Sequence, residues 1–145
     1  MAHLDLRKEL EEIFWNINRF AESTAPQVQR QVIRIIGQMA LFLADLPFPV
    51  TVSMDLDVVS EIDPRIQREL DLLLIQKGFR LETGPPRSLM PPETTFRKIF
   101  SWPKVEVQIA DPDSVIVSKA MQGRPKDRKL ILTYAEFFPA VRKRL

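Results

Sequence analysis

One short segment, residues 49–59, constrains the fold of this chain more than any other. It reads Pro-Val-Thr-Val-Ser-Met-Asp-Leu-Asp-Val-Val, a turn that runs into a short strand. Because side chains two apart on a strand share a face, Asp55 and Asp57 lie together while Leu56 and Val58 point into a core. Two adjacent anions raise each other's pKa unless a positive partner, most commonly a hard divalent cation, lies between them. Taken alone, however, the pair favours a simpler interpretation, two solvated side chains on an edge strand.

Composition limits the classes of protein and of site. A chain of 145 residues most simply forms one domain with one core. The net charge of only +2 means that nucleic-acid binding would need a local basic patch. The absence of cysteine excludes disulfides, thiolate chemistry and the usual Cys/His zinc site, and the single His3 is interpreted as incidental. No apolar run has membrane-spanning length and no signal peptide is recognised, so we expect a cytoplasmic protein.

The N-terminal part is expected to form a docking helix. From Asp5 to about Glu22, apolar residues recur at spacings of three and four, with Asp5 as the N-cap. The aromatic residues of this stripe are expected to belong to the core and not to a ligand site. Pro26 suits the first turn of a second helix.

Residues 27–46 allow two interpretations. Their apolar spacing fits one helix, but residues 32–36 followed by Gly37 also fit a buried strand and a tight turn, with residues 39–45 helical after it. We favour the strand, turn and helix.

The second half of the chain alternates helical and strand patterns, with Asp-Pro and Gly signals at the boundaries. The expected elements are a helix from Asp63-Pro64 to about Lys77, a strand over 79–83, a Pro-rich loop over 84–92 that carries Arg87 and could cover a ligand, a hairpin of 94–102 and 104–110, and helices over 114–122 and 126–138. This pattern predicts a single α+β domain over residues 1–145, a mixed sheet flanked by helices: a docking helix (1–26), a core (27–138) and a basic tail (139–145).

Four signals follow one another along the core. Together they resemble the nucleotidyltransferase superfamily with the polymerase-beta-like fold, in its small bacterial branch of uncharacterised and toxin-type members. That branch typically reads Gly-Gly-x-Ala, then Arg-x-Thr-x-Asp-hydrophobic-Asp, a strand carboxylate, and Ser-Lys…Arg-x-Lys-Asp. The resemblance covers about residues 32–138. Its four signals here are Ile35-Ile36-Gly37-Gln38-Met39-Ala40, Ser53-x-Asp55-x-Asp57, Glu106 between valines, and the segment from Ser118-Lys119 to Arg124-Pro125-Lys126-Asp127.

The resemblance implies a metal-dependent transfer of a nucleoside monophosphate from a nucleoside triphosphate to an RNA or protein acceptor. Asp55, Asp57 and Glu106 would be the catalytic residues and would hold Mg²⁺ (or Mn²⁺), with Glu106 polarising the acceptor. One form of such an enzyme is the toxin of a toxin–antitoxin pair, which would have a cognate protein partner. The nucleotide-binding residues that the resemblance implies are Gly37, Gln38, Ser53, Lys119, Arg124 and Lys126, with Asp127 anchoring the basic segment.

The chain also departs from the family pattern. Gln38 stands where the family has a second small residue, Thr51 stands where it has arginine, and the gap from Gly37 to Asp55 is longer. Glu106 replaces the commoner aspartate. These departures keep open a second function, a catalytically inactive binding or regulatory module of the same fold. A third interpretation is a protein-interaction domain that uses the N-terminal helix or the Pro-rich loop.

The charged candidates also have purely structural interpretations. Glu106 could be an ordinary solvated hairpin residue. Lys119 and Arg124 could pair weakly with Asp113 or Glu136 on the surface. The basic residues 142–144 are expected to form a solvated end of the chain.

Overall fold

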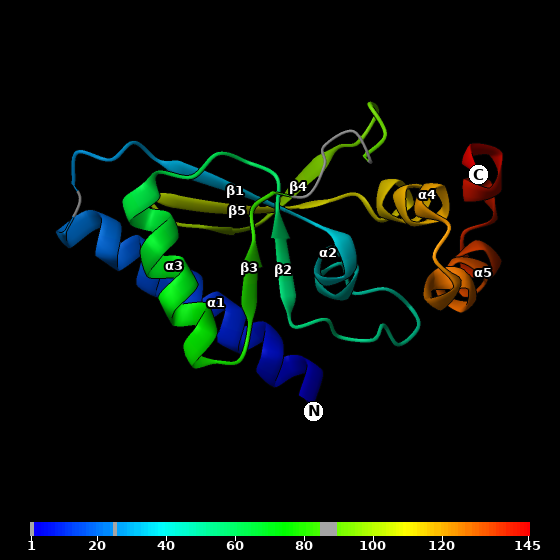
Figure 1. Ribbon diagram of the computed structural model, residues 1–145, viewed down its shortest axis with the longest axis horizontal. Coiled ribbons are helices and arrows are strands. Elements are labelled where there is room, and N and C mark those ends of the chain that lie inside the picture. The colour runs from blue at the N-terminus through cyan, green and yellow to red at the C-terminus, as the bar shows by residue number, and fades with distance from the viewer. Residues whose placement is uncertain (1, 25, 85–89) are drawn as a thin grey trace.

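The computed structural model describes residues 2–24, 26–84 and 90–145, with the side chains of residues 2–5 left out. In these residues five strands form one mixed sheet in the order β3-β2-β1-β5-β4 (Figure 1). β1 pairs in parallel with β5, and β2 with β3, whereas β1–β2 and β4–β5 are antiparallel. The strands are β1 (Gln31–Ile36), β2 (Asp55–Val58), β3 (Arg80–Glu82), β4 (Phe96–Ser101) and β5 (Val105–Ala110).

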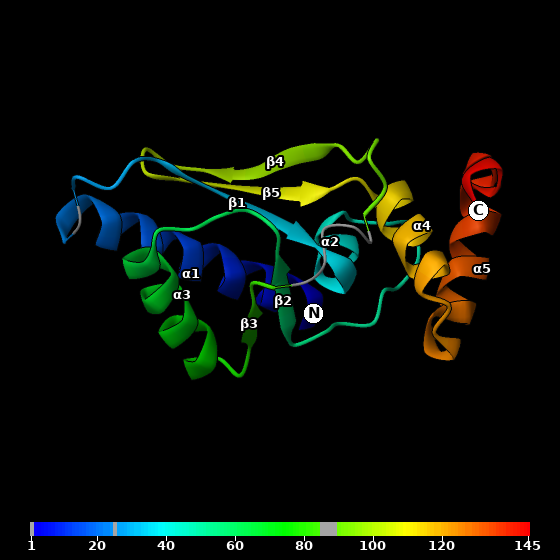
Figure 2. The same ribbon diagram turned by 45° about the horizontal axis from the view of Figure 1, so that its top comes forward.

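The helices lie in two groups around this sheet. α1 (Ala2–Ser23) and α3 (Pro64–Gln76) contact each other and lie below β1, β4 and β5 in Figure 2. At the other end of the molecule, where β1 and β5 end, lie α2 (Gly37–Leu43), α4 (Pro112–Gln122) and α5 (Arg128–Phe137). The protein is therefore a single α+β domain, as the sequence predicted. None of the helices in the described segments is long and apolar enough to cross a membrane.

Much of the hydrophobic core lies between the sheet and α1, which accounts for the apolar stripe of the N-terminal helix. The apolar stripe of α1 is buried, with Leu10, Phe14 and Ile17 fully covered. Burying each such side chain contributes about 1.5–3 kcal/mol to folding. The apolar stripe of this helix is thus used inside the domain, whereas Trp15 on the same helix is 42% exposed. The inward-facing strand residues are Ile33, Ile35, Leu56, Val58, Val105, Val107 and Ile109.

Within residues 27–46 the chain adopts the favoured strand followed by a helix, with the tight backbone bend at Gly37. β1 pairs with β5 on one side, and on the other side its last two residues pair with β2, while the backbone N–H of Arg34 donates to Ser60 Oγ. α2 follows at once, and its residues 39–43 are all buried. The second helix expected at Pro26 is wrong, because residues 26–30 form a turn and a connection that delivers the chain to β1.

Asp-Pro signals start α3 and α4 as predicted. The Asp63 carboxylate accepts a hydrogen bond from the backbone N–H of Arg65, and the Asp111 carboxylate accepts one from the N–H of Ser114. α1 differs, because it begins at Ala2 and Asp5 therefore lies within the helix. The side chain of Asp5 itself is outside the described residues.

The C-terminal half otherwise follows its sequence pattern, including the hairpin of β4 and β5. The Pro-rich loop is described only in part, and Arg87 lies outside the described residues. The last helix, α5, is preceded by a 3₁₀ turn, η2 (Pro125–Asp127), and followed by a second, η3 (Pro139–Arg144). Arg144 corrects the expectation of a solvated tail, because its guanidinium donates to Glu93 Oε1 (2.9 Å) and Ser114 Oγ (3.0 Å).

Candidate functional site

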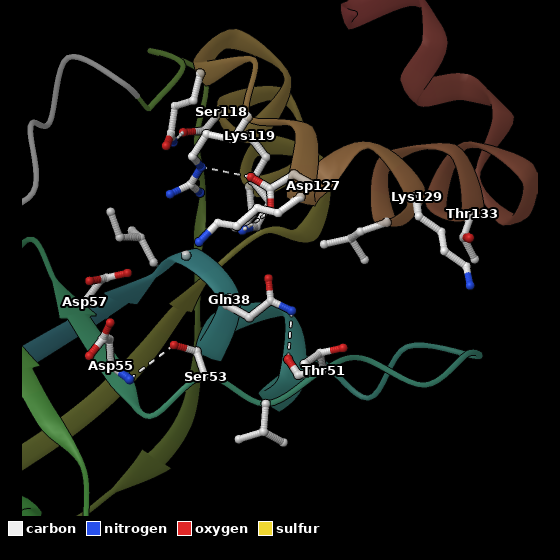
Figure 3. A pocket seen from close by; sticks show the side chains of 18 of the residues that line it. Gln38, Thr51, Ser53, Asp55, Asp57, Ser118, Lys119, Asp127, Lys129 and Thr133 are labelled. Carbon is white, nitrogen blue, oxygen red and sulfur yellow. Dashed lines mark hydrogen bonds and ion pairs between the residues drawn. The ribbon is translucent and has the colours of Figure 1, made fainter.

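A pocket of about 820 Å³ lies where the sheet meets α2, α4 and α5. Its walls come from the loop before β2, the start of α2, and the α4–α5 segment. Figure 3 shows Asp55 and Asp57 on one side of it, with Lys119 and Asp127 across from them. These three segments are separated in the sequence and converge here.

The aspartate pair lies on the face of β2 that points away from the core. Asp55 pairs in register with Arg80 of β3, and Asp57 pairs with Glu82. Asp55 Oδ1 lies 4.0 Å from Arg80 Nε, but both side chains are more than half exposed, at 52% and 76%. Such an exposed contact contributes little, so Asp55 remains available to a ligand.

Asp57 is the more buried aspartate and its carboxylate is unfavourably placed. Burial is the main cause that raises its pKa from 3.8 to about 6, and the negative charges of Asp55 and Glu82 raise it further. The positive charges of Lys119 and Arg124 act in the opposite direction without cancelling this effect. The charged form of Asp57 is therefore disfavoured, and a bound cation would stabilise it.

Gly37 lets Asp57 occupy this position. Its φ is +73°, a backbone conformation that favours glycine, and a Cβ built on it would lie 2.5 Å from Asp57 Oδ2. The aspartate thus packs directly against the backbone at the start of α2. The close approach of Asp57 therefore explains why position 37 is glycine, in addition to the phosphate contact that the resemblance implies.

Gln38 and Ser53 organise the loop in front of β2. Gln38 Nε2 donates to the carbonyl of Thr51 (2.7 Å), which ties α2 to the loop and places the side chain in the middle of the pocket (Figure 3). Ser53 Oγ accepts a hydrogen bond from the backbone N–H of Asp55 (3.1 Å) and so holds the start of β2. Both polar side chains line the pocket.

The opposite wall is basic and is organised around Asp127. Lys119 Nζ lies 3.5 Å from Asp127 Oδ1, and Arg124 Nε donates to Asp127 Oδ2 (3.0 Å). The Lys119 and Asp127 side chains are only 6% and 7% exposed. Burial lowers the pKa of Lys119, and the charge of Asp127 opposes that change. The expected anchoring by Asp127 is thus seen, whereas Asp113 instead accepts a hydrogen bond from the Tyr134 hydroxyl.

Glu106 does not join this site. Its Oε1 accepts a hydrogen bond from Arg30 Nη1 (2.7 Å), and this bond, together with that from Gln108, holds its pKa below the usual range. Glu106 pairs with Val32 of β1, whereas Asp57 pairs with Ile36. These two positions on β1 are four residues apart, which corresponds to about 13 Å along the strand. The implied role of Glu106 as third metal ligand does not fit this geometry.

The strand register shows which residues lie beside Asp57, the position that was expected for Glu106. Ile109 pairs with Ile35, so the residue of β5 level with Asp57 is the next one, Ala110, which has no ligand atom in its side chain. The acid that the sheet brings beside Asp57 is Glu82, from the other side of β2. Sequence reasoning missed Glu82 because its only signal is alternation within residues 79–83, and alternation does not name the neighbouring strand.

The remaining predicted residues come together. Among the described residues, the pocket is lined by eight of the nine predicted site residues, namely Gly37, Gln38, Ser53, Asp55, Asp57, Lys119, Arg124 and Lys126. It also has lining residues that the sequence did not indicate, from the loop before β2, the end of the Pro-rich loop and α5. These include Phe48, Met90, Lys129, Leu130 and Thr133.

The donor set fits a cation that arrives with an anionic ligand. Among the described residues, no group of three or more His, Cys, Asp or Glu side chains is arranged to hold a metal ion. Mg²⁺, however, is usually bound by one or two carboxylates together with phosphates of the substrate. Asp55 and Asp57 would supply those two carboxylates, and the basic wall would face the phosphates.

Comparisons with models of protein families, with curated proteins and with solved structures gave no significant match to this chain.

Proposed function

We propose that this pocket binds a nucleoside triphosphate as its Mg²⁺ complex and that the protein is a small nucleotidyltransferase. The observation that carries the proposal is the convergence of Asp55 and Asp57 with Lys119 and Arg124, from opposite halves of the chain, on one pocket. An aspartate pair in which burial and like charge raise the pKa of Asp57, and a basic wall across from it, match the two requirements of a metal-bound triphosphate.

The residues would divide the work as follows. Asp55 and Asp57 would hold the cation, which supplies charge neutralisation and aligns the phosphates. Lys119 is fixed by its buried pair with Asp127 and would neutralise phosphate oxygens as a positioned charge. Arg124 is 43% exposed and would contact the ligand from the mouth of the pocket. The transferred group would be the nucleoside monophosphate, and the acceptor an RNA or protein hydroxyl.

A second function, nucleotide binding without transfer, is favoured by two observations. Glu106, the expected third carboxylate, is paired with Arg30 at the far end of β5. Gln38 stands where the family pattern has a small residue, and its side chain reaches across the pocket to Thr51. A domain of this kind would sense or sequester a nucleotide.

Binding is tested first, by titrating a fluorescent analogue of ATP with and without Mg²⁺. We expect Mg²⁺-dependent binding that weakens at least about tenfold in Asp55→Asn and in Asp57→Asn, since each loses a charged ligand atom. Asp71→Asn is the matched control, because Asp71 lies on α3 and does not line the pocket. An affinity for the ATP analogue that changes neither with Mg²⁺ nor with either substitution would refute the proposed site.

Transfer is tested next, with triphosphates labelled on the α-phosphate and with RNA and protein acceptors. Mg²⁺-dependent labelling of an acceptor that disappears in Asp57→Asn would support the transferase. Tight Mg²⁺-dependent binding with no labelling of any acceptor would instead support the binding module.

A further inference from the structure

We propose that the α5 side of the pocket, formed by Phe48, Leu130 and Thr133, holds the nucleoside part of the ligand. This inference rests on the proposed function, because it assumes that the phosphates lie between the aspartate pair and Lys119. It adds a subsite that the sequence signals did not include.

The pocket extends well beyond the acidic and basic walls. Figure 3 shows Thr133 and Lys129 on the α5 helix, on the opposite side of Gln38 from Asp55 and Asp57. Its volume of about 820 Å³ lies within the range of roughly 300–1,000 Å³ that suits a complete small-molecule ligand. A triphosphate and its metal ion alone would leave the α5 side unfilled.

The two sides of the pocket differ in chemistry. Around Asp55, Asp57 and Lys119 the lining is charged, whereas on the α5 side Phe48 and Leu130 add apolar surface beside the single charge of Lys129. Thr133 adds a hydroxyl that can donate to or accept from a base edge. Apolar walls with a few placed polar groups are what a nucleobase requires, and a phosphate group does not.

Phe48 is held in place by its own packing. Its ring centroid lies 5.0 Å from that of Phe137 and 6.2 Å from that of Tyr134, the second pair being edge-to-face. The Phe48 ring is therefore packed against two aromatic rings of α5. A preformed aromatic wall binds a base with little loss of side-chain entropy.

Gln38 marks the boundary between the two sides. Its Nε2 is used by the carbonyl of Thr51, so its Oε1 is left as an acceptor within the pocket. A ribose hydroxyl placed between base and phosphates would be a suitable donor to this oxygen. Gln38, which reduces the space for phosphates, would thus hold the ribose.

The test compares Mg²⁺–ATP with Mg²⁺–tripolyphosphate, which lacks a nucleoside, by calorimetry on the full chain. Thr133→Trp would fill the proposed subsite, and we expect it to weaken ATP about tenfold or more while leaving tripolyphosphate affinity unchanged. Leu132→Trp is the matched control, because Leu132 is the preceding residue of α5, is 53% exposed and does not line the pocket. It should change neither affinity.

The possible outcomes separate this inference from the proposed function. Wild-type protein that binds ATP no more tightly than tripolyphosphate would overturn the subsite, as would Thr133→Trp with undiminished ATP affinity or with equal losses for both ligands. Failure of the wild type to bind tripolyphosphate with Mg²⁺ would instead refute the phosphate site. Should Thr133→Trp not fold, Thr133→Leu fills part of the same space, and the same comparison of the two ligands decides.

Discussion

Replacing Gly37 with alanine should damage both the fold and the site, through two effects that can be measured separately. The backbone at Gly37 has φ +73°, which costs a residue with a Cβ about 1–2 kcal/mol. The new Cβ would also lie 2.5 Å from Asp57 Oδ2, so that the carboxylate must move. We expect a loss of about 2–4 kcal/mol in the free energy of unfolding, and weaker Mg²⁺–nucleotide binding by about tenfold or more.

The chain offers a matched control for the backbone effect. Gly123 has φ +66°, and a Cβ built on it would meet nothing within 4 Å. Gly123→Ala should therefore show only the cost of about 1–2 kcal/mol, without any contact with an aspartate. The assay is urea denaturation of both variants, followed by nucleotide titration of each.

A second background isolates the contact itself. In Asp57→Ala the carboxylate that meets the new Cβ is gone, so Gly37→Ala should there cost no more than Gly123→Ala does. The difference between the two backgrounds is the coupling energy of the pair. Equal destabilisation by Gly37→Ala and Gly123→Ala in the wild-type background would refute the reasoning, because the close approach to Asp57 would then carry no cost.

Three further predictions concern individual charges. Asp57 binds its proton more tightly in the folded state (pKa about 6) than in the unfolded state (3.8), so its contribution to stability is fully present below about pH 4 and is lost as the pH rises through 6. In Mg²⁺-free solution at pH 7, Asp57→Asn should therefore raise the free energy of unfolding by about 1–2 kcal/mol, allowing for partial solvent screening, and the gain should vanish in melts below pH 4. Glu106→Gln should leave Mg²⁺–nucleotide affinity unchanged and cost less than about 1 kcal/mol, because it only weakens a partly exposed pair with Arg30. Asp127→Asn should cost about 3–5 kcal/mol in denaturant melts and weaken nucleotide binding, because it leaves the buried Lys119 without its counter-charge.

Each of these has an outcome that would contradict it. An Asp57→Asn gain that is constant from pH 4 to pH 8 would show that the buried charge is not its cause. A large loss of nucleotide affinity in Glu106→Gln would show that Glu106 does take part in nucleotide binding. Glu136→Gln, at an exposed position of α5, is the control for Asp127→Asn, and similar losses from both would show that burial of the ion pair is unimportant.

The local features of the fold could be predicted because neighbouring residues determine them. Asp63 starts α3 through a hydrogen bond to the next turn, and the alternation of Val105, Val107 and Ile109 sets one face of β5 toward the core. The pairing of Asp55 with Asp57 on one face follows from the same period. Pro26 failed as a helix signal because strand pairing of β1 with β2 and β5 outweighed the local preference.

The sequence by itself determined which side chains share a face, where helices begin, and which charges are candidates for a site. Only the tertiary structure decided how those faces are set against one another: β5 places Glu106 level with Val32, away from the pair, while β3 places Glu82 beside Asp57. The physical reason is that periodicity depends on bonds between adjacent residues. Strand order and register, by contrast, depend on how distant segments bury their apolar surfaces together, and a repeat of two residues carries no information about that.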